Sequence, residues 1–260
     1  MGHVRLGRLP RTRKWNQVIA LLSGGASAKE IAAATSSAAE KDMLRASQDP
    51  AFVHAFWLLT QIPLLARQKD FGVALRGIGL DVGDRPGLVE IIAAVSDAVD
   101  VHARTVGGRT DVGEMAQLSA VESLTAIAGR ELPGLFGPTH EEVRAAFAGL
   151  ATEKQFSVLA RDFFSRLTRR YLGYYLSREL SNHVGTNARF HSVAEHAEFE
   201  QALDLHCRET SRILKEYSGE WFSKTNYYEG GINAKKAGGF AYVAFKKMRG
   251  ELRQRRDADG

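Results

Sequence analysis

One uninterrupted stretch, residues 153–184, constrains the fold of this chain more than any other feature. It contains no proline and one interior glycine, Gly173, so nothing in it stops a helix of about nine turns. Thr152 and Gln155 have the spacing of a capping box at its start, and Gly185 is a residue that can end it. We therefore expect one long helix over residues 153–184.

The apolar residues of this stretch predict that it lies inside a helical bundle. One apolar stripe follows a spacing of four, three, four, four and three residues, and consists of Phe156, Ala160, Phe163, Leu167, Tyr171 and Tyr174. Other apolar side chains, Phe164, Leu172, Tyr175 and Leu176, lie off that stripe. A helix that is apolar on more than one side is covered by neighbours on several sides, so we expect 153–184 to be the central helix.

The remaining residues predict further helices and few strands. The chain has only six prolines, and the alternation typical of half-buried strands is nearly absent. Capping-box spacings open three more segments, at Ser27 and Glu30, at Asp111 and Glu114, and at Thr139 and Glu142. Asn233 is the expected cap of the last helix. The predicted fold is all-α, an irregular bundle of about ten helices.

A glycine- and proline-rich stretch, residues 129–142, is the best candidate for a boundary between two packed lobes. Of the 23 aromatic residues, six precede His140 and 17 follow it. We therefore predict an alanine- and leucine-rich lobe over 1–132, with a basic N-terminal arm, and an aromatic-rich lobe over 139–260. A continuous core would give the same aromatic counts if the lobes pack tightly together.

Basic residues gather at the two ends of the chain. Residues 1–14 contain five arginines and lysines and no acid, and residues 235–256 contain eight against one glutamate. Because the formal charge of the whole chain is only +5, the residues between these segments are acidic overall. Such asymmetry indicates an acidic partner, either a protein or a nucleic acid. The candidate contact residues are Arg5, Arg8, Arg11, Arg13, Lys14, Lys235, Lys236, Lys246, Lys247, Arg249, Arg253, Arg255 and Arg256.

Three aromatic residues extend the list of candidate contacts. Trp221, Tyr227 and Tyr228 lie in residues 219–231, which we expect to be irregular. They could stack on bases, contact a partner protein, or cover the core under a loop. The arrangement of the basic ends separates the partners: ends that converge on one face favour a nucleic acid, whereas dispersed ends favour an adaptor protein.

Residues 25–47 resemble the spacing of a helix-turn-helix, with Glu30 to Ala32 in the first helix and residues 36–38 at the turn. The second helix would offer only Lys41 and Arg45 to a groove, alongside two acidic residues. Helices that read DNA are usually denser in such contacts. A plain corner between two helices is therefore the favoured interpretation.

The chain carries none of the standard catalytic motifs, such as a nucleophile elbow, a phosphate-binding loop or a zinc-protease signature. One weak metal candidate combines two pairs with a spacing of four: Glu179 with His183, and His196 with Glu200. If the two helices run antiparallel, these carboxylates and imidazoles could bind a divalent ion. Such pairs are more often ordinary contacts on a helix surface. We expect no metal and no cofactor.

Composition predicts a cytoplasmic protein without membrane contact. The single cysteine, Cys207, excludes a disulfide framework, and no apolar segment of a signal peptide follows the basic N-terminus. The longest uncharged run, residues 51–66, is shorter than the roughly 20 residues that a membrane span needs.

These observations predict a non-enzymatic helical interaction protein, an adaptor or subunit of a multi-component bacterial assembly such as a defence system. The first alternative is a nucleic-acid-binding protein that uses both basic segments. The second is a metal-dependent enzyme. The partner and the oligomeric state are left open.

Overall fold

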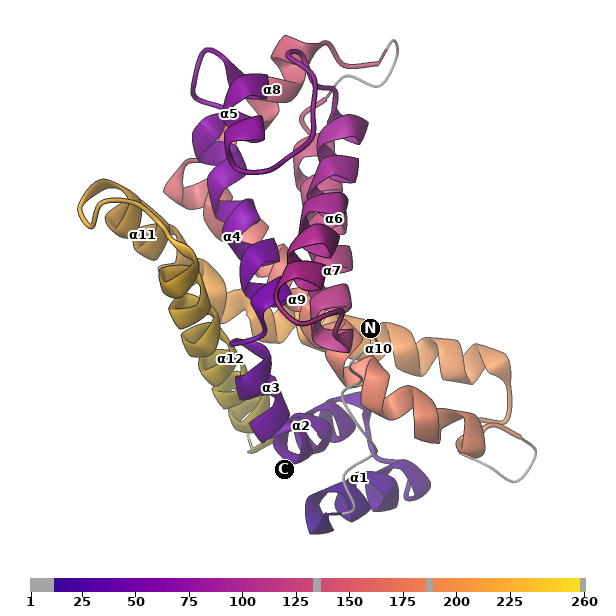
Figure 1. Cartoon of the computed structure of the whole chain (residues 1–260). Helices are drawn as coiled ribbons and strands as arrows, with labels where there is room; N and C mark the ends of the chain where they lie inside the picture. Colours follow the sequence, from indigo (N-terminus) through magenta and orange to yellow (C-terminus); the bar gives the residue numbers. More distant parts are fainter. Residues whose placement is uncertain (1–11, 133–136, 186–188, 258–260) are drawn as a thin grey trace.

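The computed structural model describes residues 12–132, 137–185 and 189–257. Within these ranges the chain is all-α, as expected, with two short 3-10 turns and one isolated bridge between Val184 and Phe190. Its helices are α1 (Arg13–Ser23), α2 (Ala28–Ala38), α3 (Glu40–Ala46), α4 (Pro50–Leu65), α5 (Phe71–Gly77), α6 (Leu88–Thr105), α7 (Asp111–Gly129), α8 (His140–Gly149), α9 (Glu153–Leu180), α10 (Val193–Thr210), α11 (Leu214–Tyr227) and α12 (Ala234–Asp257) (Figure 1).

The predicted long helix is α9, and it begins and ends close to the expected residues. Its first turn is capped by Thr152, whose hydroxyl oxygen accepts the N–H of Gln155 at 3.3 Å. The α-helix ends at Leu180, short of 184, and a 3-10 turn follows. The backbone groups of His183 and Gly185 bond to Phe190 in place of helical partners, and this pairing stops the helix early.

Helix α9 is central, because α2, α7, α10 and α11 all pack against it. Its predicted stripe is buried from Phe156 to Tyr171, and so are the off-stripe residues Phe164 and Tyr175. Helix α11 comes closest at Gly219, where a Cβ atom would lie 2.3 Å from the carbonyl oxygen of Glu153. This glycine lies inside a regular helix. The expectation of an irregular segment from residue 219 is therefore wrong as far as Tyr227.

Aromatic rings from both halves of the chain meet in one core. Phe56 of α4 stacks on Phe240 of α12, with centroids 5.5 Å apart, and on Phe163 of α9 at the same distance. Phe164 of α9 contacts Phe245 of α12 edge to face. The buried apolar residues on either side of the 129–142 boundary belong to a single cluster. The division into two lobes stays a prediction, and the two halves share this core.

The helix-turn-helix spacing is not realised as predicted. Residues 36–38 lie inside α2, and only Ala39 separates α2 from α3. Ser36 is buried, so this part of the segment is a packed helix rather than an exposed turn. Helix α3 leaves α2 at an angle, which is the plain corner that the sequence favoured (Figure 1).

Four of the five predicted caps are at the expected residues: Ser27, Thr139, Thr152 and Asn233. Ser27 with Glu30 and Thr139 with Glu142 form complete capping boxes. The cap of α7 is Thr110 rather than Asp111, because the Thr110 hydroxyl accepts the N–H of Gly113 and also bonds to Asp49, the N-cap of α4. None of the helices in the described ranges combines the length and the apolar character of a membrane span.

Replacing Phe163 with alanine tests the central position of α9. The ring is fully buried between α4 and α9, so Phe163→Ala should lower the free energy of unfolding by about 3–5 kcal/mol in chemical denaturation. Tyr228→Ala is the control, because this ring is 85% exposed and its loss should change stability by less than about 0.5 kcal/mol. A loss below about 1 kcal/mol for Phe163→Ala would mean that α9 is peripheral.

Candidate functional site

Helix α12 is anchored on one side and presents a basic, aromatic face on the other. Asn233 caps it, since its side-chain oxygen accepts the N–H of Lys236 at 2.9 Å. The buried side carries Phe240, Ala244 and Met248. The helical period places four other residues along one exposed line, Lys235, Gly239, Tyr242 and Lys246. We call these four residues the α12 face.

The described parts of the two basic segments converge at one end of the molecule. The ammonium group of Lys14, in the first turn of α1, donates to the carbonyl oxygen of Ser37 near the end of α2 at 3.2 Å. Helix α12 packs on α2 and on α3. Figure 1 accordingly shows α1, α2, α3 and the C-terminal half of α12 together at the lower end. Four exposed residues here, Arg13, Lys14, Arg45 and Lys246, are called the basic end below.

Some of the predicted contact residues have other partners within the chain. Lys236 donates to the carbonyl oxygens of Glu229 and Gly231, and so holds the turn before α12. Lys247 lies 5.0 Å from the centre of the Tyr217 ring. Arg249 is half-buried. Arg5, Arg8 and Arg11 lie outside the described residues, as do the side chains of Arg253, Arg255 and Arg256.

The three predicted aromatic contacts divide between core and surface. Trp221 is half-buried and stacks on Phe240 with centroids 4.2 Å apart, so it covers the core. Tyr227 is 58% exposed, and its hydroxyl accepts a hydrogen bond from Arg67. Tyr228 is 85% exposed. Tyr242 is not among the contacts predicted from the sequence, although its position four residues before Lys246 places it on the same helix face.

A groove of about 590 Å³ lies between α12 and the junction of α3 with α4. Its lining consists of Ser47, Gln48, Val53, Ala234, Lys235, Gly238, Gly239 and Tyr242. Two consecutive lining residues, Gly238 and Gly239, have no side chains that would fill the groove. A Cβ atom on Gly238 would approach Val53 at 3.3 Å, whereas one on Gly239 would meet no atom within 4 Å. The groove therefore runs along the α12 face and shares Lys235, Gly239 and Tyr242 with it. We call it the α12 groove.

The residues of the weak metal candidate have other contacts. The carboxylate of Glu200 forms an ion pair with Arg169 of α9. The ring of His196 packs edge-on against Phe190, with centroids 5.4 Å apart. Among the described residues, no three histidine, cysteine or acidic side chains lie close enough together to hold a metal ion. The structure therefore does not bring the four predicted ligands together at one site.

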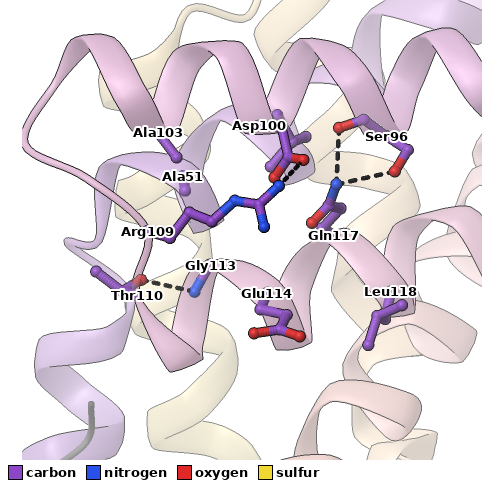
Figure 2. A pocket seen from close by; sticks show the side chains of 11 residues that line it. Ala51, Ser96, Asp100, Ala103, Arg109, Thr110, Gly113, Glu114, Gln117 and Leu118 are labelled. Atoms are coloured by element: carbon purple, nitrogen blue, oxygen red, sulfur yellow. Dashed lines mark hydrogen bonds and ion pairs between the residues drawn. The ribbon is translucent and has the colours of Figure 1, made fainter. Parts of the chain in front are cut away.

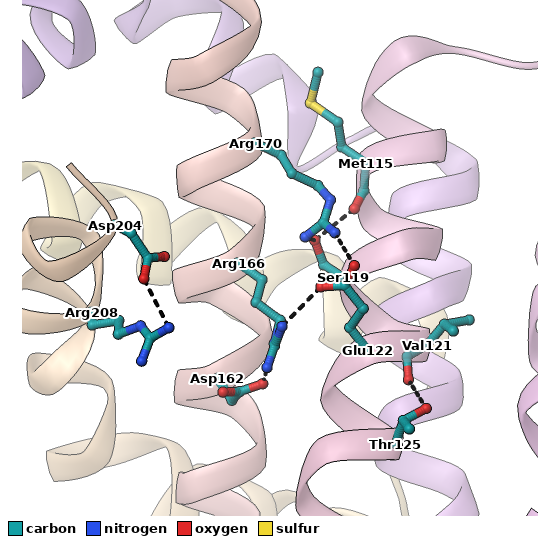
Figure 3. A network of polar contacts seen from close by, with 10 residues as sticks. All are labelled: Met115, Ser119, Val121, Glu122, Thr125, Asp162, Arg166, Arg170, Asp204 and Arg208. Atoms are coloured by element: carbon teal, nitrogen blue, oxygen red, sulfur yellow. Dashed lines mark hydrogen bonds and ion pairs between the residues drawn. The ribbon is translucent and has the colours of Figure 1, made fainter. Parts of the chain in front are cut away.

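A second group of charged residues connects α7 and α9 (Figure 3). The carboxylate of Glu122 on α7 accepts hydrogen bonds from Arg166 and Arg170 on α9. Arg166 also donates to Asp162 at 2.6 Å. Because each of these guanidinium groups faces a carboxylate, the group acts as a clamp between helices and presents no excess charge to a ligand.

A small pocket of about 120 Å³ lies between α6 and α7 (Figure 2). Four of its polar side chains bond in two pairs: Arg109 pairs with Asp100, and the amide of Gln117 donates to the carbonyl and hydroxyl oxygens of Ser96. Pockets for small organic ligands usually measure about 300–1,000 Å³. This pocket is therefore a joint between two helices rather than a ligand site.

Two histidines stack where α4 meets α6. The centroids of the His54 and His102 rings lie 4.2 Å apart, the rings are nearly parallel, and Trp57 also stacks on His54. Burial, and then the neighbouring His102, lowers the pKa of His54 to about 4. Burial also lowers the pKa of His102, against the opposing effect of Asp49. The stack thus favours neutral imidazoles. Elsewhere, burial raises the pKa of the Cys207 thiol to about 12, so this cysteine is not a ready nucleophile.

The histidine stack predicts a loss of stability in mild acid. An unfolded histidine titrates near pH 6.5, whereas folded His54 titrates near 4, so the unfolded chain binds the extra proton between these values. The contribution of His54 to the free energy of unfolding is fully present above about pH 6.5 and is lost as the pH falls towards 4. Denaturation at several pH values should show a smaller acid loss for His54→Gln than for the parent, while the exposed control His191→Gln should follow the parent. Equal acid losses for all three proteins would contradict the assignment.

Comparisons of the chain with models of protein families, with curated proteins and with solved structures found no match. The arrangement of its own residues is therefore the basis for a functional proposal.

Proposed function

We propose that this chain binds nucleic acid through the basic end. The observation that carries the proposal is the convergence of the described parts of both basic segments beside α2 and α3. Lys14 of α1 contacts Ser37 of α2, and α12 packs on α2 and α3. Positive charges from distant parts of the sequence thus lie near one another.

The physical basis is charge neutralisation by groups on rigid elements. Arg45 and Lys246 lie on packed helices, and Arg13 lies in the first turn of α1. Such groups can meet several phosphates without the entropic cost of ordering a flexible tail. Each neutralised phosphate releases counterions from the nucleic acid, which supplies most of the affinity of sequence-independent binding.

This proposal reverses the order of the two leading hypotheses from the sequence. An adaptor protein was the first expectation, with nucleic-acid binding as the alternative. Converging basic ends are the arrangement that favours nucleic acid, and they change the ranking. An acidic partner protein would also be attracted to this surface, so the test has to separate the two.

Salt dependence provides that test. If about four to six basic groups engage a duplex, the logarithm of the binding constant should fall against the logarithm of salt concentration with a slope between roughly −3.5 and −5.5. The triple variant Arg13→Gln, Arg45→Gln and Lys246→Gln should flatten this slope by about two to three units, with little dependence on sequence. Fluorescence anisotropy with a labelled duplex measures both quantities.

A second triple variant, with the same net charge as the first, is the control. Arg130→Gln, Lys154→Gln and Lys224→Gln remove three exposed positive charges from α9, α11 and the end of α7, and should leave the slope within about half a unit of the parent. Equal slopes for both triple variants would place the contact outside the basic end. No binding of DNA or RNA by micromolar protein at low salt would end the proposal and leave the acidic protein partner.

A further inference from the structure

We infer that the α12 groove holds an unpaired base of a single-stranded nucleic acid, stacked on Tyr242, while Lys235 and Lys246 contact the adjoining phosphates. This inference rests on the proposed function and adds the class of substrate. It follows from three features of the groove: an open floor, an exposed ring at its edge, and cations on the same helix face.

The floor of the groove has room for a flat ring. Gly238 and Gly239 carry no side chains, and the position of a Cβ atom on Gly239 is free of neighbours within 4 Å. Two consecutive glycines in a helix interior weaken the helix by roughly 1 kcal/mol each relative to alanine. Side chains at these positions would fill the groove. The two glycines therefore lower the stability of α12 and leave the α12 groove open.

The ring of Tyr242 gives the groove a stacking surface. It is 42% exposed although α12 is a core helix, and it lines the groove together with Val53. A base stacked on an exposed aromatic ring gains about 1–3 kcal/mol, and every base has a face for such stacking. Gln48, at the opposite wall, offers an amide donor and an amide acceptor to the edge of a base.

Charge complementarity selects a nucleic acid as the occupant. Lys235 lines the groove itself, and Lys246 follows Tyr242 by one helical turn on the same side. The two ammonium groups are exposed and lie on helix positions eleven residues apart, which is about 16 Å along the axis. A strand that lays one base in the groove can therefore place a phosphate near each lysine.

The same geometry favours a single strand over a duplex. A base in a duplex must be unpaired and unstacked before it can enter a pocket, which costs a few kcal/mol. A single strand presents bases that are free to turn outward. The groove should therefore bind single strands more tightly, while the basic end contributes to the binding of both forms.

Anisotropy with two probes tests this inference. The probes are a labelled oligothymidylate of about 16 nucleotides and a labelled duplex of the same length. The parent protein should bind the single strand at least about tenfold more tightly than the duplex. Gly239→Leu fills the groove, and Tyr242→Ala removes the stacking ring. Each should weaken single-strand binding by about tenfold and leave duplex binding unchanged.

Two controls make the result specific. Gly77→Leu introduces the same side chain into open space on α5 and should change neither affinity. Leucine has a higher helix propensity than glycine, so α12 should stay folded in Gly239→Leu, which circular dichroism can verify. A strand of equal length without bases should bind the parent no more tightly than oligothymidylate binds Gly239→Leu.

The outcomes separate the two proposals. Equal affinities for the single strand and the duplex, unchanged in Gly239→Leu and Tyr242→Ala, would overturn the base-binding groove and leave the basic end as a duplex-binding surface. Failure of both probes to bind would overturn the proposed function as well.

Discussion

The contact among the rings of Phe56, Phe164 and Phe240 is the interaction on which the rest of this structure depends. These rings come from α4, α9 and α12, three helices that are far apart in the sequence. Burial of each ring stabilises the fold by about 1.5–3 kcal/mol, and their mutual contacts add to this. The same contacts fix which side of α12 faces the core. The exposed face, with Lys235, Tyr242 and Lys246, is therefore set by packing rather than by charge.

Polar contacts complement this core and set the relative positions of the outer helices. Arg189 donates to the carbonyl oxygens of Leu22 and Ala26 at the end of α1, and its guanidinium also lies over the rings of Phe190 and Phe199. It thereby connects α1 to the start of α10. The position of α1 matters for function because Lys14 and Arg13 extend from its first turn. A structural arginine, not itself in the proposed surface, thus helps to bring the two basic segments together.

Local features of the fold could be predicted from the sequence, whereas long-range ones could not. The capping boxes at Ser27 and Thr139 and the long helix α9 follow from spacings within a few residues. The convergence of Lys14 with α12 depends on packing between segments more than 200 residues apart, which no local spacing encodes. The sequence left three roles open for Trp221, and only its stacking on Phe240 in the structure distinguishes among them. The α12 groove could not be predicted, because in the sequence Gly238 and Gly239 indicate only a low helix propensity.

Native-state hydrogen exchange tests the central claim, that one shared core holds both halves and thereby orients α12. Amides of α4, α9 and α12 should exchange as one group, with the free energy of global unfolding, because the contacting rings link these three helices. Chemical denaturation should likewise show one cooperative unfolding transition. Two groups of slow amides with different opening free energies, one within residues 12–132 and one within residues 139–257, would contradict the account. They would show that the halves unfold separately and that packing between them does not orient α12.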